Sequence, residues 1–147
     1  MIRGNLLMRY GGNTQENAAL VIQNVMIGDL IGNVFPEPLD GLVDTGADRS
    51  AVPLRICSAL KLEILNRLRV VGFDGRVKEC SSYLVYIKIK PFGDVPLEVF
   101  GVERTSVLLG RDYLKSMLLI MDKRVQKYGL GASARWKTTW IRLMSLL

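Results

Sequence analysis

Short runs of β-branched and aromatic residues, broken by turn residues about every 8–12 positions, constrain the fold of this chain most strongly. The clearest run is residues 83–90 (YLVYIKIK), in which an aromatic or aliphatic residue occupies every second position. A period of two is typical of a strand with one buried face. Many short strands of this kind predict a mostly β protein, built as a small, mainly antiparallel barrel or sandwich.

Turn residues set the limits of the expected elements. Asp74-Gly75 predicts a two-residue type I′ hairpin turn, and Pro53 favours the start of a helix directly after it. We therefore expect two short helices, at residues 54–60 and 111–117. We expect strands at residues 18–26, 41–43, 68–73, 76–89, 95–100, 106–109 and 118–121, the last of which closes the body.

Composition excludes several kinds of active site. The 147 residues are enough for one domain and include no histidine, which excludes Ser/His and Cys/His catalytic pairs and His-containing zinc sites. Cys57 and Cys80 are too few for a Cys₄ metal site or a disulfide scaffold, and we expect them to be small buried residues. We expect no metal and no cofactor. Without a readable signal peptide or an apolar run of membrane-spanning length, we expect a cytoplasmic protein.

Excess positive charge is confined to the end of the chain. Residues 123–147 hold six Lys or Arg and no acidic residue, so residues 1–122 are close to neutral and nucleic-acid binding is not expected. On a helix, the four apolar residues at spacings of 4, 3 and 4 would share one face: Trp136, Trp140, Leu143 and Leu147. That face either packs on the body or contacts a membrane surface or a partner. We expect a body at 1–122 and a basic extension at 123–147.

Carboxylates are the remaining candidates for catalysis. Asp44 follows an apolar strand and precedes Thr45 and Gly46, so its carboxylate loses solvation while its small neighbour lets another backbone approach. Two carboxylates that share a proton can act as acid and base together, whereas one cannot. A chain with one Asp-Thr-Gly would have to obtain the second from another copy through a two-fold axis. The alternative is a plain connection from strand to turn, because Asp and Gly favour turns.

The sequence resembles the retropepsin-like aspartic proteases. Residues 42–48 (LVDTGAD) match the active-site motif of that family, and residues 108–112 (LLGRD) look like its second signature, two hydrophobic residues and a glycine before a short helix. Residues 71–77 occupy the position of the flap hairpin between the two motifs. The resemblance covers residues 17–122. It implies a small closed β-barrel of the acid-protease type with one short helix after the second motif.

The resemblance also implies roles for individual residues. Asp44 of each subunit would activate the attacking water, supported by Thr45, Gly46 and Ala47. Asp48 would also pair with Arg111 as a structural ion pair. The residues implied to bind substrate, at the cleft wall and the flap tip, are Asp48, Gly72, Phe73, Asp74, Gly75, Leu108 and Leu109.

Three functions are compatible with these patterns. The first is a homodimeric aspartic endopeptidase that cleaves extended polypeptides. The second is a dimeric peptide-binding or assembly module with the same fold and no turnover. The third is a membrane or nucleic-acid binder in which residues 123–147 make the contacts and the body is a scaffold.

Overall fold

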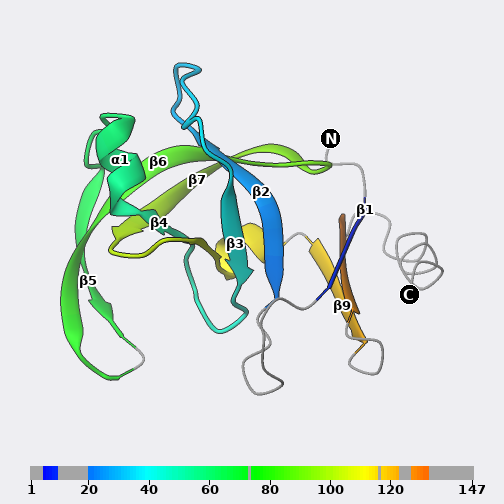
Figure 1. Ribbon diagram of the computed structural model, residues 1–147. Helices are drawn as coiled ribbons and strands as arrows, with labels where there is room; N and C mark the ends of the chain where they lie inside the picture. The colour runs from blue at the N-terminus through cyan, green and yellow to red at the C-terminus, as the bar shows by residue number, and fades with distance from the viewer. Residues whose placement is uncertain (1–4, 10–19, 73, 116, 123–126, 133–147) are drawn as a thin grey trace.

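A seven-stranded sheet that closes on itself forms most of the molecule (Figure 1). The computed structural model describes residues 5–9, 20–72, 74–115, 117–122 and 127–132. Six strands form the ring, because β2 pairs with both β3 and β6, and the seventh, β5, extends it outward from β6. The predicted closed, mostly β fold is therefore confirmed. In sheet order the strands are β2 (Val21–Gly28), β3 (Leu39–Val43), β8 (Val107–Leu109), β4 (Ala51–Pro53), β7 (Gly93–Val102), β6 (Val77–Ile89) and β5 (Asn66–Val71).

The core fills the inside of this ring. Along β6 the side chains of Tyr83, Val85, Ile87 and Ile89 are buried, and the residues between them are half-buried, which is the alternation that the sequence predicts. Strand β3 packs closely against the core at Gly41, where an added Cβ would lie only 2.9 Å from a methyl of the Val25 side chain. A larger residue at Gly41 would push β3 out of place.

Two parallel pairings bring distant segments of the chain together. Strand β3 pairs with β8 so that Gly41 faces Val107 and Val43 faces Leu109, and β4 lies parallel to β7. The other strand pairs of the ring are antiparallel. As a result, the chain that leaves β3 and the chain that leaves β8 emerge at the same end of the ring.

Both expected helices are present, but the second is shorter than predicted. Helix α1 (Leu54–Ala59) starts directly after Pro53. Helix α2 (Arg111–Leu114) has one turn, and β9 (Met117–Asp122) already begins where the prediction still had helix. The apolar residues at 117–119 are half-buried and pair with a neighbouring strand, which favours strand over another helical turn.

A second sheet of three strands lies beside the ring, on the right in Figure 1. Its order is β1 (Asn5–Arg9), β10 (Lys127–Ala132) and β9, all antiparallel. The expectation that residues 118–121 form the last strand is therefore wrong, because β10 follows and pairs with them. The proposed boundary at residue 122 stays a prediction. The predicted helix with Trp136 and Trp140 lies outside the described residues.

Two absences apply to the described part of the chain. Among these residues, no helix has both the length and the apolar character needed to cross a membrane. Within the same ranges no cluster of three or more Cys, Asp or Glu side chains is arranged to hold a metal ion. Both cysteines are free; Cys57 is buried, and burial raises the pKa of its thiol to about 11, which keeps it protonated and unreactive.

Candidate active site

Asp44 lies directly after β3, at the end of the ring where β8 also ends. Its backbone N–H donates to the carbonyl oxygen of Leu109 at 3.0 Å, which extends the pairing of β3 with β8 by one bond. Its side chain is half-buried, and its Oδ1 accepts a hydrogen bond from the Gly46 N–H at 2.9 Å. Within the described residues its Oδ2 accepts no hydrogen bond, so this oxygen is available to a water or a substrate.

The small residues after Asp44 form a tight turn around its carboxylate. The Ala47 N–H donates to the Asp44 carbonyl at 3.3 Å, which closes the turn. A Cβ added at Gly46 would lie 3.2 Å from Asp44 Oδ1, close enough to crowd the carboxylate. Thr45 and Gly46 are exposed and Ala47 is half-buried. The Asp-Thr-Gly turn therefore presents the carboxylate and an accessible backbone on the same surface.

Hydrogen bonds of Ser50 and Asp112 connect this turn to the second motif. The Asp112 carboxylate accepts hydrogen bonds from the Ser50 hydroxyl at 2.7 Å and from the backbone N–H groups of Ser50 and Tyr113. The fully buried Ser50 hydroxyl in turn accepts from the Gly110 N–H at 3.0 Å. A further backbone bond joins the Arg111 N–H to the Ala47 carbonyl at 2.8 Å. The two sequence motifs are thus one hydrogen-bonded unit.

Gly110 is required by the closeness of this contact. A Cβ at this position would lie 2.7–2.8 Å from the backbone carbonyl group of Arg49, which cannot move without breaking the turn.

Sequence reasoning assigned no role to Ser50 or Asp112. Asp112 is the acidic residue in the first turn of α2, a position that favours acidic side chains, and that preference was the available signal.

Asp48 and Arg111 form an ion pair, at the positions where the sequence placed one. Their side chains are 80% and 60% exposed, so the pair lies at the surface of the subunit. The reason is that the backbone of this segment, rather than its charged side chains, faces the interior: Asp112 N–H donates to the Asp48 carbonyl. An exposed pair of this kind contributes little to the stability of one subunit.

Leu108 and Leu109 face opposite sides of β8. Leu109 is fully buried in the core of the ring, so the expectation that it walls a cleft is wrong; Leu108 is half-buried. The period of two along a strand requires that only one of two neighbours points inward. Leu108 is therefore the member of the pair that remains available to line a cleft.

The hairpin of β5 and β6 ends in the turn predicted at Asp74-Gly75, but the type of turn differs. Gly75 has a φ of +75° and its N–H donates to the Gly72 carbonyl, while the Gly72 N–H donates to the Arg76 carbonyl. The φ of Asp74 is not positive, so the predicted type I′ turn, which needs two positive φ angles, is wrong. The Asp74 carboxylate instead accepts from the Arg76 N–H, which fixes the turn. Phe73 lies outside the described residues.

This hairpin exposes two valines near its tip. Val71 and Val77 face each other across the two strands and are 67% and 60% exposed. Figure 1 shows the hairpin tip and the loop that follows β3 on the same lower side of the ring. Apolar side chains exposed on the side that carries Asp44 are suited to contact a peptide or another chain.

Arg104 is a further charged residue near Asp44, and sequence reasoning did not single it out. It lies between β7 and β8, is half-buried, and donates from Nη2 to the Ser106 hydroxyl at 3.3 Å. Burial lowers the pKa of its guanidinium below the usual value, and the negative charge of Asp44 acts in the opposite direction. A guanidinium stays charged despite such shifts. The candidate site thus combines a carboxylate with a neighbouring cation.

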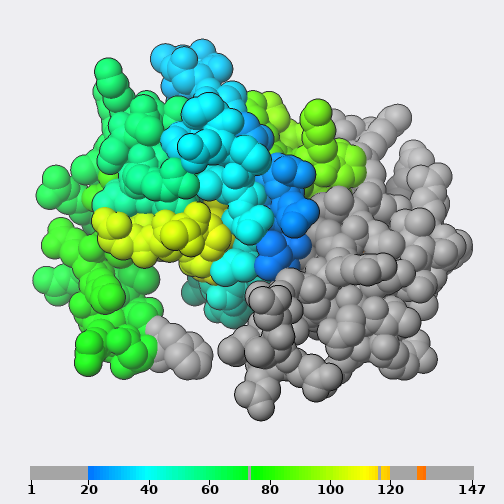
Figure 2. All heavy atoms as spheres, in the orientation of Figure 1, coloured from blue at the N-terminus to red at the C-terminus, as the bar shows by residue number. Residues whose placement is uncertain are grey.

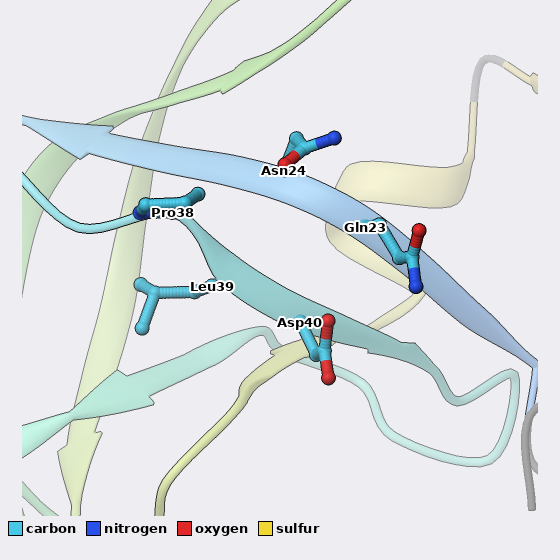
Figure 3. Close-up of a pocket in the computed structure, with 5 residues that line it drawn as sticks. All are labelled: Gln23, Asn24, Pro38, Leu39 and Asp40. Carbon is cyan, nitrogen blue, oxygen red and sulfur yellow. The ribbon is translucent and has the colours of Figure 1, made fainter.

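A shallow depression of about 280 Å³ lies elsewhere, between β2 and β3 (Figure 3). Gln23 and Asn24 line it from β2, where the pairing register with β3 shifts, and Asn24 has a φ of 60°. Asp40 lines it from β3. No residue of the two motifs contributes to this depression, so it is separate from the candidate site.

Comparisons with known proteins agree with this geometry. Residues 31–116 match the family described as "gag-polyprotein putative aspartyl protease". The EIAV protease, solved in complex with the inhibitor HBY-793, is 25% identical with a TM-score of 0.50, covering 71% of this chain and 92% of its own. A retropepsin-like aspartic protease from Rickettsia conorii is 14% identical with a TM-score of 0.57, covering 88% and 91%. No curated protein matches the chain. With its two motifs joined at one end of a closed β ring, the chain belongs to the retropepsin-like aspartic protease family.

Proposed function

We propose that this protein is an aspartic endopeptidase that hydrolyses extended polypeptides as a homodimer, with one Asp44 contributed by each subunit. The observation that carries the proposal is the Asp44 carboxylate, which has one oxygen held by the Gly46 N–H and the other without a bond in the described residues. A two-fold axis beside Asp44 would bring two such carboxylates together. The exposed Thr45 beside it is free to donate a hydrogen bond across that axis.

In the proposed reaction the two carboxylates share one proton. The ionised Asp44 takes a proton from a water, whose oxygen attacks the carbonyl carbon of the substrate, while the protonated Asp44 gives its proton to the carbonyl oxygen. The C–N bond of the tetrahedral intermediate then breaks. The amine nitrogen receives the proton that the first carboxylate took, and a hydroxyl of the intermediate returns a proton to the second. Both carboxylates end in their starting states.

Substrate would bind as an extended strand beneath the hairpin of β5 and β6. Main-chain hydrogen bonds to the hairpin and the exposed backbone at Gly46 would hold it, and Leu108 would contact its side chains. Closure of the hairpin would exclude bulk solvent from the site, apart from the one water molecule that reacts. The free cysteines fit a reducing compartment, and cytoplasmic location remains part of the proposal.

The substitution Asp44→Asn tests the proposal. It keeps the shape of the side chain and removes the ionisable group, so kcat/KM on a mixed peptide library should fall by about 10³-fold or more, while peptide binding persists. Asp40→Asn, four residues earlier on the exposed side of β3, is the matched control and should keep full activity. A wild-type protein that binds peptides tightly and never cleaves them would instead identify the alternative, a peptide-binding module of the same fold.

A further inference from the structure

Arg104 is a half-buried cation whose hydrogen-bonding capacity is largely unused. Its Nε is buried and has no hydrogen-bond partner in the described part of the chain. Nη2 makes a single long bond, 3.3 Å, to the hydroxyl of Ser106. The segment that follows β7, residues 103–106, is yellow in Figure 2 and lies at the surface on the face drawn there. The accessible end of the guanidinium, rather than the buried Nε, therefore retains the donors that a ligand could use.

Four other arginines among the described residues are paired with carboxylates. Arg49, Arg55, Arg76 and Arg111 each form an ion pair, and their side chains are 42% to 82% exposed. Arg104 is more buried than an ordinary surface arginine, yet no carboxylate of the described residues lies within ion-pair distance of it. A charge that is partly removed from water without a partner is costly, and such a charge is typical of a binding site rather than of a structural ion pair.

The position of Arg104 relates it to the reaction. The segment of residues 103–106 leads directly into β8, the strand that pairs with β3 and ends beside Asp44. The charge of Asp44 acts on the Arg104 guanidinium, although the two groups do not form an ion pair. The cation therefore lies near the Asp44 carboxylate without contacting it, and a peptide bound at Asp44 would lie near Arg104 as well.

We propose that Arg104 is a specificity-determining residue that binds the carboxylate of an Asp or Glu side chain of the substrate near the scissile bond. This inference rests on the proposed endopeptidase function. The two Nη groups at the end of one guanidinium present parallel N–H donors, which match the two oxygens of a carboxylate. The guanidinium also offsets the repulsion between Asp44 and an acidic substrate. In a symmetric dimer, two copies of Arg104 would favour acidic residues on either side of the cleaved bond.

Pairs of peptides that differ only by Glu or Gln test this proposal. Glu is placed in turn at each of the three positions on either side of the cleaved bond, and kcat/KM is measured for each pair. For the wild-type protein we expect at least one position at which Glu is favoured over Gln by about tenfold or more. In Arg104→Met, which keeps most of the side-chain volume, that preference should disappear, so that kcat/KM becomes equal for the Glu and Gln peptides of each pair.

Two variants control this measurement. Arg67→Met removes an equal charge from an exposed position of β5 and should leave the preference unchanged. Arg104→Lys keeps the charge but loses the planar pair of donors, so the preference should fall to an intermediate value; this variant decides the question if Arg104→Met does not fold. The proposal is overturned if the wild-type protein shows no preference for Glu at any position, or if the preference survives both substitutions at Arg104.

A binding measurement separates this proposal from the proposed catalytic function. The Kd of the same labelled Glu and Gln peptides is measured by fluorescence polarisation for Asp44→Asn and for Asp44→Asn combined with Arg104→Met. If the Glu peptide binds more tightly than the Gln peptide, and if this difference depends on Arg104, the inference about Arg104 is supported. It is supported even where the wild-type protein cleaves no peptide; the lack of cleavage would reject the endopeptidase function alone. Cleavage by the wild-type protein without a Glu preference would reject the inference alone.

Discussion

The carboxylate of Asp112 stabilises the Asp-Thr-Gly turn more than the exposed ion pair beside it does. It accepts hydrogen bonds from the hydroxyl and the N–H of Ser50 and from the N–H of Tyr113, in a half-buried position. Replacing it by alanine leaves buried donors without an acceptor. We therefore expect Asp112→Ala to lower the free energy of unfolding by about 2–4 kcal/mol, measured by urea denaturation of the wild-type protein and the variant side by side.

Arg111→Ala, at the neighbouring position, is the natural comparison. It breaks the exposed ion pair with Asp48, which contributes less than about 1 kcal/mol in most proteins. Equal losses of stability in the two variants, or a larger loss for Arg111→Ala, would show that the buried hydrogen bonds of Asp112 do not dominate this contact.

At the scale of elements, the connection between β2 and β3 is a loop ordered by one carboxylate. Asp29 is 8% exposed, and it accepts hydrogen bonds from the N–H of Ile31 and from the N–H and side-chain amide of Asn33. Burial raises the pKa of Asp29, but these bonds and one from Gly32 together hold it below its usual value. The loop projects from the ring at the top of Figure 1 and exposes 87% of Ile31.

The lowered pKa of Asp29 predicts a pH-dependent contribution to stability. Because the folded state favours the ionised form, the contribution is present above the unfolded pKa, about 4, and is lost as the pH falls through the lower folded value. Asp29→Ala should therefore lower the free energy of unfolding at pH 7, and the loss should become progressively smaller towards pH 3. Urea denaturation at pH 7, 5 and 3 measures the free energy of unfolding of the wild-type protein and of Asp29→Ala, with Asp40→Ala as the exposed control. A difference between wild type and Asp29→Ala that stays constant down to pH 3 would contradict the prediction.

At the scale of the whole molecule, the ring presents one Asp44 where the proposed reaction needs two. Activity should therefore belong to the dimer, and the specific activity should fall on dilution as dimers dissociate. Subunit mixing gives a sharper measurement. Wild-type and Asp44→Asn proteins are mixed one to one, with the total protein concentration kept constant. After the subunits have exchanged at random, about a quarter of the dimers contain two wild-type subunits.

The two outcomes of this mixing experiment are well separated. A dimer that needs both carboxylates retains about a quarter of the original activity after exchange, whereas a subunit active by itself retains about half. The Asp40→Asn protein, mixed in the same way, should leave the activity unchanged. Retention of half the activity together with full specific activity at the highest dilution would reject the dimeric mechanism.

Local sequence patterns determined most of the ring. Alternation along 83–90 fixed the buried face of β6, Pro53 fixed the start of α1, and the Asp74-Gly75 pair located the hairpin between β5 and β6. The predicted strands of the ring agree with the observed ones to within three residues at each end. These features depend on neighbours in the chain, through side-chain period and backbone preference, and such signals are readable without a fold.

Long-range contacts were decided only by the tertiary structure. Ser50 and Asp112 meet because β3 and β8 lie parallel and end together. No local sequence pattern in either segment predicts this contact. The alternation along β8 requires one of Leu108 and Leu109 to face inward, but only packing against the core selects Leu109. The approach of Arg104 to Asp44 likewise depends on how two distant segments fold over one another. The sequence by itself therefore determined which carboxylate is the candidate for catalysis, and the tertiary structure determined what holds and surrounds it.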